Sequence, residues 1–290
     1  MKTQHITIIG LGLIGGSLGL ALKAAYGEKI HITGIDKEEA SMHQALACGA
    51  IDKFSSSLPE GVNGADIVFL CTPVLQIVHM VQEILPFLKQ GAIITDVGST
   101  KKYIGEALEK ILPEGITYIG GHPMTGREQS GILAADKNLF RNKWYIVILN
   151  KTTQQDAVDE VCRLAEATGA TVTVMDATIH DRCAAVISHV PHVTAAAMVN
   201  LLDLYPEKEE SLKLAAGGFR DTTRIASSNA DMWADICMTN PAAITGSLRN
   251  LQGLLGEMIE AMENGDRQFI HDFFAAAKNK RDKLLPAVTN

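Results

Sequence analysis

The chain has 290 residues, of which 47% are hydrophobic, enough for one large domain or two ordinary ones. Its formal net charge of −7 argues against electrostatic binding to nucleic acid or to an anionic membrane surface. The five cysteines are widely spaced and include no CxxC pair, which argues against a disulfide framework and a zinc site. We therefore predict a soluble protein of the reducing cytoplasm.

The first strong pattern is a short apolar run, Ile6–Ile9, followed by the turn GLGLIG at positions 10–15. A strand, a tight turn and the start of a helix in this order are typical of a dinucleotide-binding site. Gly10 permits the turn, Gly12 lets the backbone approach a pyrophosphate, and Gly15 lets the helix pack closely on the sheet. Free N–H groups at the helix start would meet the phosphate charge. An ordinary glycine-rich turn is the alternative.

A second predicted strand, Ile30–Ile35, ends before Asp36, about 20 residues beyond the turn, where a carboxylate would accept hydrogen bonds from an adenosine ribose. The charge of Asp36 would repel a 2′-phosphate, so we predict NAD as the cofactor, although the adjacent Lys37 leaves some use of NADP open. The predicted cofactor contacts are Gly10, Gly12, Leu13, Ile14, Gly15, Asp36, Thr72 and Pro73.

Downstream, strand-like and helix-like segments alternate as far as Met175. The predicted strands lie near 53–54 and at 67–71, 92–95, 117–119, 144–149 and 171–175, and the predicted helices at 13–25, 37–48, after Pro73, and at 103–112 and 156–167. This alternation predicts an α/β fold with a doubly wound, Rossmann-like, mainly parallel sheet. We assign residues 1–175 to a dinucleotide-binding domain.

After Asp176 the strand-like runs stop, and helical patterns follow at 180–202, 233–238 and 244–262. We therefore predict an all-helical C-terminal domain at 176–290 that binds substrate. The stretch 195–202 has little polar surface, so we expect it to be buried within this domain or against a second copy of the chain, and we predict a homodimer.

Two polar residues follow predicted strands at the ligand-binding edge of the sheet. Ser99, after 92–95, would hydrogen-bond a substrate hydroxyl or the nicotinamide ribose; alternatively Ser99 or Thr100 caps the next helix. His122, after 117–119, would take a proton or a hydrogen bond from a hydroxyl that is being oxidised. A loop histidine without a role is the alternative.

A third cluster comprises the pair His180-Asp181 and, further along, His189 and His192. The latter two share a helix face, but no carboxylate or thiol lies nearby at a matching spacing, so we predict no metal site. Pro191 is expected to kink this helix and to free backbone carbonyl groups.

A fourth cluster contains Arg220 and Arg224, four residues apart. Two arginines at this spacing can face one anion, because a guanidinium binds a carboxylate through two parallel hydrogen bonds. Both are substrate-binding candidates. A local pair with Asp221 on a solvated surface is the alternative.

The segments GLGLIGGSLGLALK, DVGSTK, GGHPMTG, HDRCAAVISHVPH and GGFRDTTRIA, in this order and at these separations, closely resemble the prephenate dehydrogenase family of tyrosine biosynthesis. The resemblance covers nearly the whole chain. It implies an NAD-dependent oxidative decarboxylation: prephenate loses a hydride from the ring carbon that bears its 4-hydroxyl and carbon dioxide from C1, giving 4-hydroxyphenylpyruvate. Neither a metal nor a covalent nucleophile is needed.

The resemblance also implies roles for the candidate residues. His122 is similar to the histidine that hydrogen-bonds and polarises the 4-hydroxyl, and Ser99 to its partner at that hydroxyl. His192 is similar to a substrate-site residue, with His189 close behind, and Arg224 to the arginine that binds a substrate carboxylate.

One residue departs from the family pattern, since Thr125 stands where alanine is usual; this change should leave His122 in place. The nearest rival function is arogenate dehydrogenase, the same chemistry on the amino analogue of the substrate. A 3-hydroxyacid dehydrogenase or imine reductase would instead be expected to use a lysine or another polar group in the helical domain. A redox-sensing NAD-binding protein would need a DNA-binding or partner-binding segment, and the acidic chain shows none.

Overall fold

The computed structural model describes residues 3–127, 129–149 and 154–284. Contacts within the chain separate two compact units, Met1–Pro241 and Ala242–Asn290. The first unit contains the sheet and every candidate residue named above, whereas the sequence predicts a boundary after residue 175.

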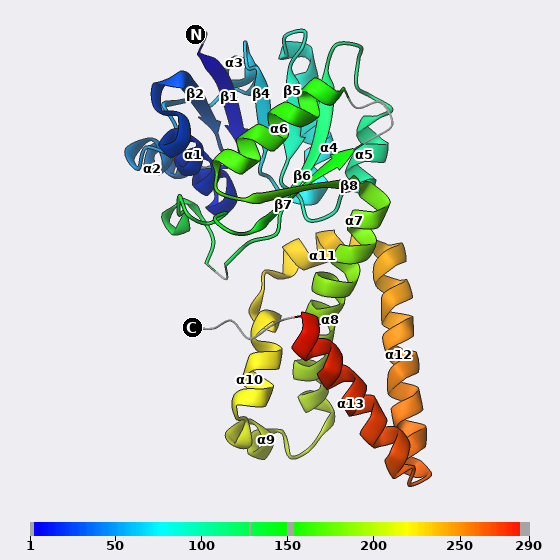
Figure 1. Ribbon diagram of the computed structural model, residues 1–290. Coiled ribbons are helices and arrows are strands. Elements are labelled where there is room, and N and C mark those ends of the chain that lie inside the picture. Colours follow the sequence, from blue (N-terminus) through cyan, green and yellow to red (C-terminus); the bar gives the residue numbers. More distant parts are fainter. Residues whose placement is uncertain (1–2, 128, 150–153, 285–290) are drawn as a thin grey trace. The chain divides into compact units, whose positions relative to one another are not determined.

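Within the described residues, eight strands form one sheet in the order β3-β2-β1-β4-β5-β6-β7-β8 (Figure 1). Neighbouring strands are parallel as far as β6, β7 runs antiparallel to β6, and β8 is parallel to β7. The predicted fold class is therefore confirmed. The bounds are β1 Gln4–Ile9, β2 Ile30–Ile35, β3 Lys53–Phe54, β4 Ile67–Leu70, β5 Ile93–Asp96, β6 Thr117–Pro123, β7 Trp144–Leu149 and β8 Thr171–Asp176.

Helices cover both faces of this sheet. Buried side chains of α1 and α2 form a core cluster on one face, and those of α6 lie partly in this cluster and partly in a smaller one beside it. Buried side chains of α3, α4 and α5 form the cluster on the other face. Helix α4 shows the cause most clearly, because its buried residues Val74, Ile77, Val81 and Ile84 recur at helical spacing. The bounds are α1 Leu13–Tyr26, α2 Glu39–Ala47, α3 Leu58–Val62, α4 Val74–Ile84, α5 Lys102–Leu108 and α6 Gln155–Ala167.

Strand β6 is longer than the sequence predicts, and this moves His122. The predicted strand stops at Ile119, which is also where β6 stops pairing with β5. Beyond that point, residues 120–123 pair with the antiparallel strand β7, and His122 lies opposite Ile146. The expectation that His122 follows the strand is therefore wrong, because pairing with a strand formed later in the chain extends β6 through His122.

The remaining helices of the first unit follow β8. Their bounds are α7 Ala177–Ala184, α8 Val190–Leu201, α9 Lys208–Leu214, α10 Gly217–Thr223 and α11 Ala230–Thr239, with short 3₁₀ turns at Leu202–Leu204 and Arg224–Ser227. Asp176 begins α7 as its N-cap, where its carboxylate accepts hydrogen bonds from two backbone N–H groups. A π-helical turn, Ala185–His189, joins α7 to α8 just before Pro191. The irregularity in this helical run thus lies just before the proline, and the kink expected at Pro191 stays a prediction.

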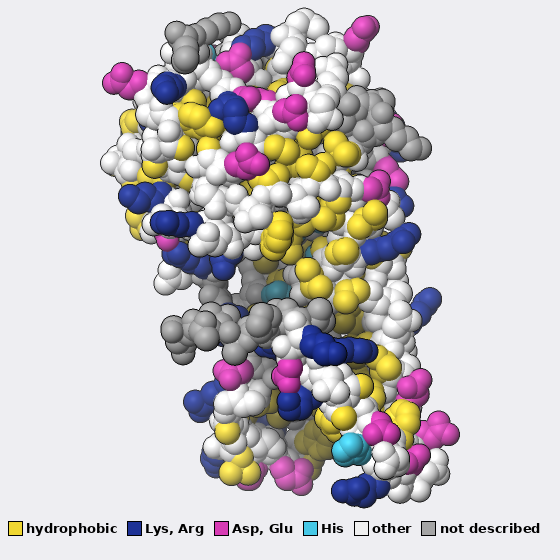
Figure 2. All heavy atoms as spheres, in the orientation of Figure 1, with side chains coloured by type: hydrophobic (Ala, Val, Ile, Leu, Met, Phe, Trp, Pro, Cys, Tyr) yellow, Lys and Arg dark blue, Asp and Glu magenta, His cyan; other side chains and the backbone are white. Residues whose placement is uncertain are grey.

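The surface of α7 and the π turn is apolar. Hydrophobic side chains gather over α7 and the adjoining end of β8 (Figure 2), and Ile179, Val186 and Ile187 are each more than half exposed. Residues 177–204 are also the one helical run among the described residues that is long and apolar enough to cross a membrane. A helix that packs on a second protein surface passes the same test, and this one contains buried His180 and Asp181.

The second unit consists mainly of two helices. Helix α12 (Pro241–Glu263) and helix α13 (Arg267–Leu284) form a helical hairpin (Figure 1). The backbone N–H of Asp266 donates to the carbonyl oxygen of Ala261 at 2.8 Å and closes the turn between them.

Candidate active site

The glycine turn lies at the carboxyl end of β1, in the shape that a pyrophosphate requires. Gly10 has φ +95°, and a Cβ atom there would lie 2.6 Å from the carbonyl oxygen of Cys71. A Cβ atom at Gly15 would lie 1.9 Å from the oxygen of Gly10, so the start of α1 packs directly on the turn. A Cβ atom at Gly12 would meet nothing within 4 Å, and no side chain caps α1 there. The first N–H groups of α1 therefore face open space suited to an anion.

Two further side chains fit a dinucleotide beside this turn. The Asp36 carboxylate accepts hydrogen bonds from the backbone N–H groups of Leu11 at 2.6 Å and Glu38 at 2.9 Å, which fixes it against the turn and leaves lone pairs for a ribose. The Thr72 hydroxyl is buried without a hydrogen-bond partner among the described residues. Pro73, by contrast, is exposed at the start of α4.

The histidine on β6 is one end of a buried hydrogen-bond chain. Nδ1 of His122 lies 2.7 Å from Nε2 of His180, and Nδ1 of His180 lies 2.8 Å from the Asp181 carboxylate. All three residues are buried. The Asp181 carboxylate also accepts hydrogen bonds from the backbone N–H groups of Lys101 at 2.9 Å and Lys102 at 3.0 Å.

This chain determines where the hydrogens of both imidazoles lie. A carboxylate only accepts hydrogen bonds, so Nδ1 of His180 bears the hydrogen and its Nε2 is an acceptor. Nδ1 of His122 must then donate to that nitrogen, which leaves Nε2 of His122 with a free lone pair. Burial, aided by the nearby His180, Lys101 and His189, lowers the pKa of His122 well below its usual value. His122 is therefore a neutral acceptor at neutral pH.

A second group of aromatic and imidazole rings lies where the π turn meets α11. The ring of His192 stacks on Trp233 with centroids 3.9 Å apart, and its Nδ1 donates to the carbonyl oxygen of Ser188 at 2.9 Å. Nδ1 of His189 accepts a weak hydrogen bond from the Asn240 side-chain amide at 3.4 Å, so its Nε2 bears the hydrogen.

Two buried N–H donors in this group lack an acceptor in the described part of the chain. Nε2 of His189 and Nε1 of Trp233 are buried and have no hydrogen-bond partner among the described residues. Arg224, at the end of α10, is close enough to His192 to contribute to the lowering of its pKa, behind the larger effect of burial. Two orphan donors and a nearby cation suit a carboxylate ligand.

The other predicted residues contribute less to these two groups. Ser99 is half-buried, and its hydroxyl forms no hydrogen bond with the part of the chain that the structure describes. No side chain caps α5, and the Thr100 hydroxyl instead donates to Thr239 at 2.9 Å, so the helix-cap explanation is wrong. Arg220 is exposed and forms no ion pair within the described residues.

Sequence reasoning missed two parts of the site. Trp233 gave no signal beyond being one of two tryptophans. Lys101 and Asp96 form a fully buried ion pair below the loop that contains Ser99, and a charged pair within the motif DVGSTK was the available signal.

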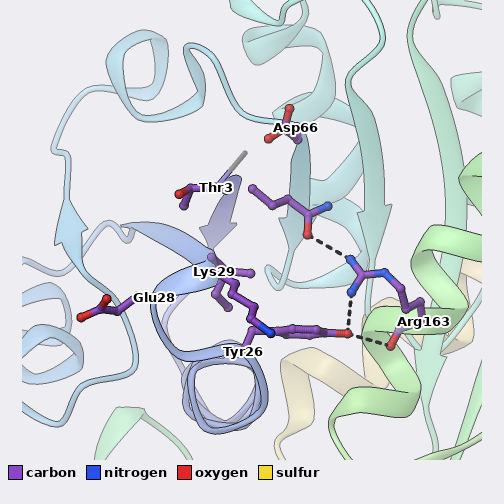
Figure 3. Close-up of a pocket in the computed structure, with 8 residues that line it drawn as sticks. Thr3, Tyr26, Glu28, Lys29, Asp66 and Arg163 are labelled. Atoms are coloured by element: carbon purple, nitrogen blue, oxygen red, sulfur yellow. Dashed lines mark hydrogen bonds between the residues drawn. The ribbon is translucent and has the colours of Figure 1, made fainter. Parts of the chain in front are cut away.

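Neither a metal cluster nor the cavity at the other edge of the sheet offers an alternative functional site among the described residues. Within the described residues, no group of three or more His, Cys, Asp or Glu side chains could hold a metal ion. A cavity of about 890 Å³ lies at the opposite, amino-terminal edge of the sheet (Figure 3). Its Arg163 guanidinium is already bound to Tyr26, Gln4 and Glu160, and none of the candidate residues lines it.

The comparisons with known proteins agree with this geometry. Residues 18–174 match the sequence model "Prephenate dehydrogenase, nucleotide-binding domain", and residues 176–276 match "Prephenate dehydrogenase, dimerization domain". The chain belongs to the prephenate dehydrogenase family. A prephenate dehydrogenase of Bacillus subtilis is 37% identical over 96% of this chain and 76% of its own length.

Two crystal structures of family members are similar throughout. Prephenate dehydrogenase from Aquifex aeolicus, in complex with hydroxyphenyl propionate and NAD⁺, is 30% identical with a TM-score of 0.91, over 98% of this chain and 99% of that one. Arogenate dehydrogenase from Synechocystis is 28% identical with a TM-score of 0.85, over 97% and 100%. The chain is thus an oxidoreductase of this family, and its two matched segments meet at residues 174–176.

Proposed function

We propose that this chain catalyses the NAD-dependent oxidative decarboxylation of prephenate to 4-hydroxyphenylpyruvate. The observation that supports this most strongly is the hydrogen-bond chain from Asp181 through His180 to His122. It leaves Nε2 of a neutral imidazole as an acceptor at the sheet edge where the glycine turn also lies. Bound NAD supplies the acceptor for the hydride that leaves ring carbon C4.

His122 acts on the hydroxyl of that carbon. Its Nε2 accepts a hydrogen bond from the 4-hydroxyl and stabilises the positive charge that develops on this oxygen as the hydride leaves. The C1–carboxylate bond then breaks, its electron pair completes the aromatic ring, and the oxygen keeps its proton as a phenol. Ser99 is the second contact to the hydroxyl.

The two substrate carboxylates need cationic or N–H partners in a partly buried site. Arg224 supplies the cation, and Nε2 of His189 and Nε1 of Trp233 supply donors that have no other described acceptor. His192, stacked on Trp233, forms the adjoining wall. Arg220 remains a candidate for a peripheral contact.

The cofactor occupies the carboxyl edge of β1, β2 and β4. The residues proposed to bind it are Gly10, Gly12, Leu13, Ile14, Gly15, Asp36, Thr72 and Pro73. The open space at Gly12 and the orphan Thr72 hydroxyl are the features that fit it best. In this assignment, residues 1–175 bind the cofactor and residues 176–290 supply the substrate-binding helices.

We also propose a cytoplasmic homodimer. The exposed apolar side chains of α7 and the π turn need a partner surface, and residues 176–276 match a model described as a dimerization domain. All five cysteines are free thiols, as expected in a reducing compartment.

Purified protein with NAD, offered prephenate or arogenate in separate reactions, tests the proposal through the absorbance of NADH. Formation of NADH with prephenate and release of carbon dioxide is the expected result. Formation with arogenate alone would transfer the specificity to the amino analogue. No reaction with either would refute the proposed chemistry.

A further inference from the structure

The loop after β5 contains a lysine that the mechanism above does not use. Lys101 is 1% exposed; its ammonium pairs with the Asp96 carboxylate and donates to the carbonyl oxygen of Gly121 at 2.7 Å. The same carboxylate accepts hydrogen bonds from the Tyr118 hydroxyl at 2.8 Å and the Gly98 N–H at 2.9 Å. Fully buried ion pairs add little stability compared with apolar side chains of similar volume, so a structural role alone explains this pair poorly.

The position of Lys101 is more informative than its burial. Gly121, which its ammonium holds, directly precedes His122 on β6. The backbone N–H of Lys101 donates to the carboxylate of Asp181, the residue that orients His180. Lys101 therefore contacts Asp181, at one end of the three-residue hydrogen-bond chain, and Gly121, the neighbour of His122 at the other end.

Building on the function proposed above, we propose that Lys101 is a positioning residue for the reaction. Its side chain binds the strand end that presents His122, and its backbone binds Asp181, which orients His180. Lys101 therefore fixes the positions of both imidazoles that form the 2.7 Å contact. A displacement of the acceptor nitrogen by about 1 Å is enough to cost a factor of about 100 in rate.

The ammonium is also a fixed positive charge close to the reacting imidazole. The groups around His122 include His180 and Asp181 from α7, His189 from the π turn, and the Lys101–Asp96 pair from the β5 side. Among the charged neighbours, Lys101 helps to keep His122 unprotonated. Removal of the ammonium should therefore move the acid limb of the kcat/KM profile to higher pH.

The test compares Lys101→Met with Lys102→Met. Lys102 is the matched control because its backbone N–H binds the same carboxylate, whereas its side chain is half exposed and pairs with Glu106 on the same helix. In Lys101→Met we expect kcat to fall about 10- to 100-fold, prephenate KM to change less than about threefold and the acid limb to move upward. Lys102→Met should match the wild type in all three.

A second variant separates this role from simple stability. Lys101→Met leaves the Asp96 carboxylate buried and unpaired, so the thermal midpoint should fall. The double variant Asp96→Asn with Lys101→Met removes both charges and should recover much of that midpoint. If Lys101 positions and tunes His122, the double variant keeps the shifted acid limb and a reduced kcat.

A spectroscopic readout does not depend on activity. The proton that His122 donates to His180 should give an imidazole resonance downfield of the backbone amides, which disappears in His122→Asn. We expect it to broaden or shift in Lys101→Met but not in Lys102→Met. An unmoved resonance and an unmoved acid limb would overturn the proposal, as would full recovery of kcat in the double variant. Failure of the wild type to oxidise prephenate would refute the proposed function instead, and the resonance would still test the position of Lys101.

Discussion

Nδ1 of His122 and Nε2 of His180 lie 2.7 Å apart, and this contact determines which nitrogen of His122 is available to substrate. The two residues come from a strand and a helix separated by 58 positions. Because His180 is itself oriented by Asp181, the free lone pair of His122 depends on a carboxylate that acts through a second imidazole.

Replacement of His122 by asparagine should lower kcat about 100-fold or more, with little change in prephenate KM. The imidazole acts mainly in the transition state, where positive charge develops on the 4-hydroxyl oxygen. Initial rates of NADH formation over a range of prephenate concentrations measure both constants. A large rise in KM at unchanged kcat would show that His122 only binds the ground state.

Replacement of Asp181 by asparagine should lower kcat at least about 100-fold, because the amide can donate to Nδ1 of His180 and reverse both imidazole tautomers. Nε2 of His122 would then bear a hydrogen and could not accept a hydrogen bond from the 4-hydroxyl. Asp176→Asn is the matched control, since it makes the same change at the N-cap of the same helix. Equal losses in the two variants would assign the effect to helix α7 as a whole.

Replacement of Arg224 by alanine should raise prephenate KM strongly, by at least about tenfold, with a smaller effect on kcat, because a charge-assisted contact to a carboxylate is lost in ground and transition states alike. Arg220→Ala provides the comparison, since this arginine lies four residues earlier and is exposed. If Arg220→Ala had the larger effect on KM, the assignment of the carboxylate site would be reversed.

Replacement of Asp36 by serine should narrow the preference for NAD over NADP. The carboxylate, held by the Leu11 N–H at 2.6 Å, would repel a 2′-phosphate, and serine removes that charge. The ratio of kcat/KM for the two cofactors measures the change. Lys37→Ala, which alters an exposed neighbouring charge, tests whether any shift is specific; an unchanged ratio in Asp36→Ser would contradict the assignment.

The stability of the fold should decrease as the pH falls below about 6.5. Burial lowers the pKa of His189 to about 4, so between these values the unfolded chain binds more protons than the folded one. This stabilisation is complete above the pKa that His189 has in the unfolded chain, and it is lost as the pH falls through the pKa that His189 has in the folded protein. His189 accounts for up to about 3 kcal/mol of the free energy of unfolding. His122 and His192, whose pKa values are also lowered, change stability in the same direction.

Urea unfolding at neutral pH and near pH 4.5 measures this dependence. His189→Gln should reduce the difference in unfolding free energy between the two conditions, whereas His43→Gln, at an exposed position, should leave it unchanged. The same pH dependence in both variants would show that His189 does not contribute.

Local patterns predicted the parts of the fold and site that depend on local structure. The glycine turn needs only a few consecutive residues and a strand before it, so its location and the place of Asp36 beside it could be inferred directly. The strands buried on both faces, such as Ile67–Leu70, were recognisable as short apolar runs.

The non-local parts could not be predicted in this way. The strand position of His122 depends on pairing with β7, and its contact with His180 depends on how α7 packs at the end of the sheet. The Lys101–Asp96 pair is close in sequence, but burial of its charges follows only from the folded environment. Trp233 enters the candidate site through its stacking with His192 and through its indole N–H, which lacks a described partner.

The π turn at Ala185–His189 holds one residue more than the stretch of regular α-helix with nearly the same rotation and rise. Deletion of one residue from this turn would therefore give a regular α-helix and leave α8 nearly in place. His192 would keep its stacking on Trp233. A variant selected only for a more stable helix would thus change the substrate site through the turn itself, which contains His189.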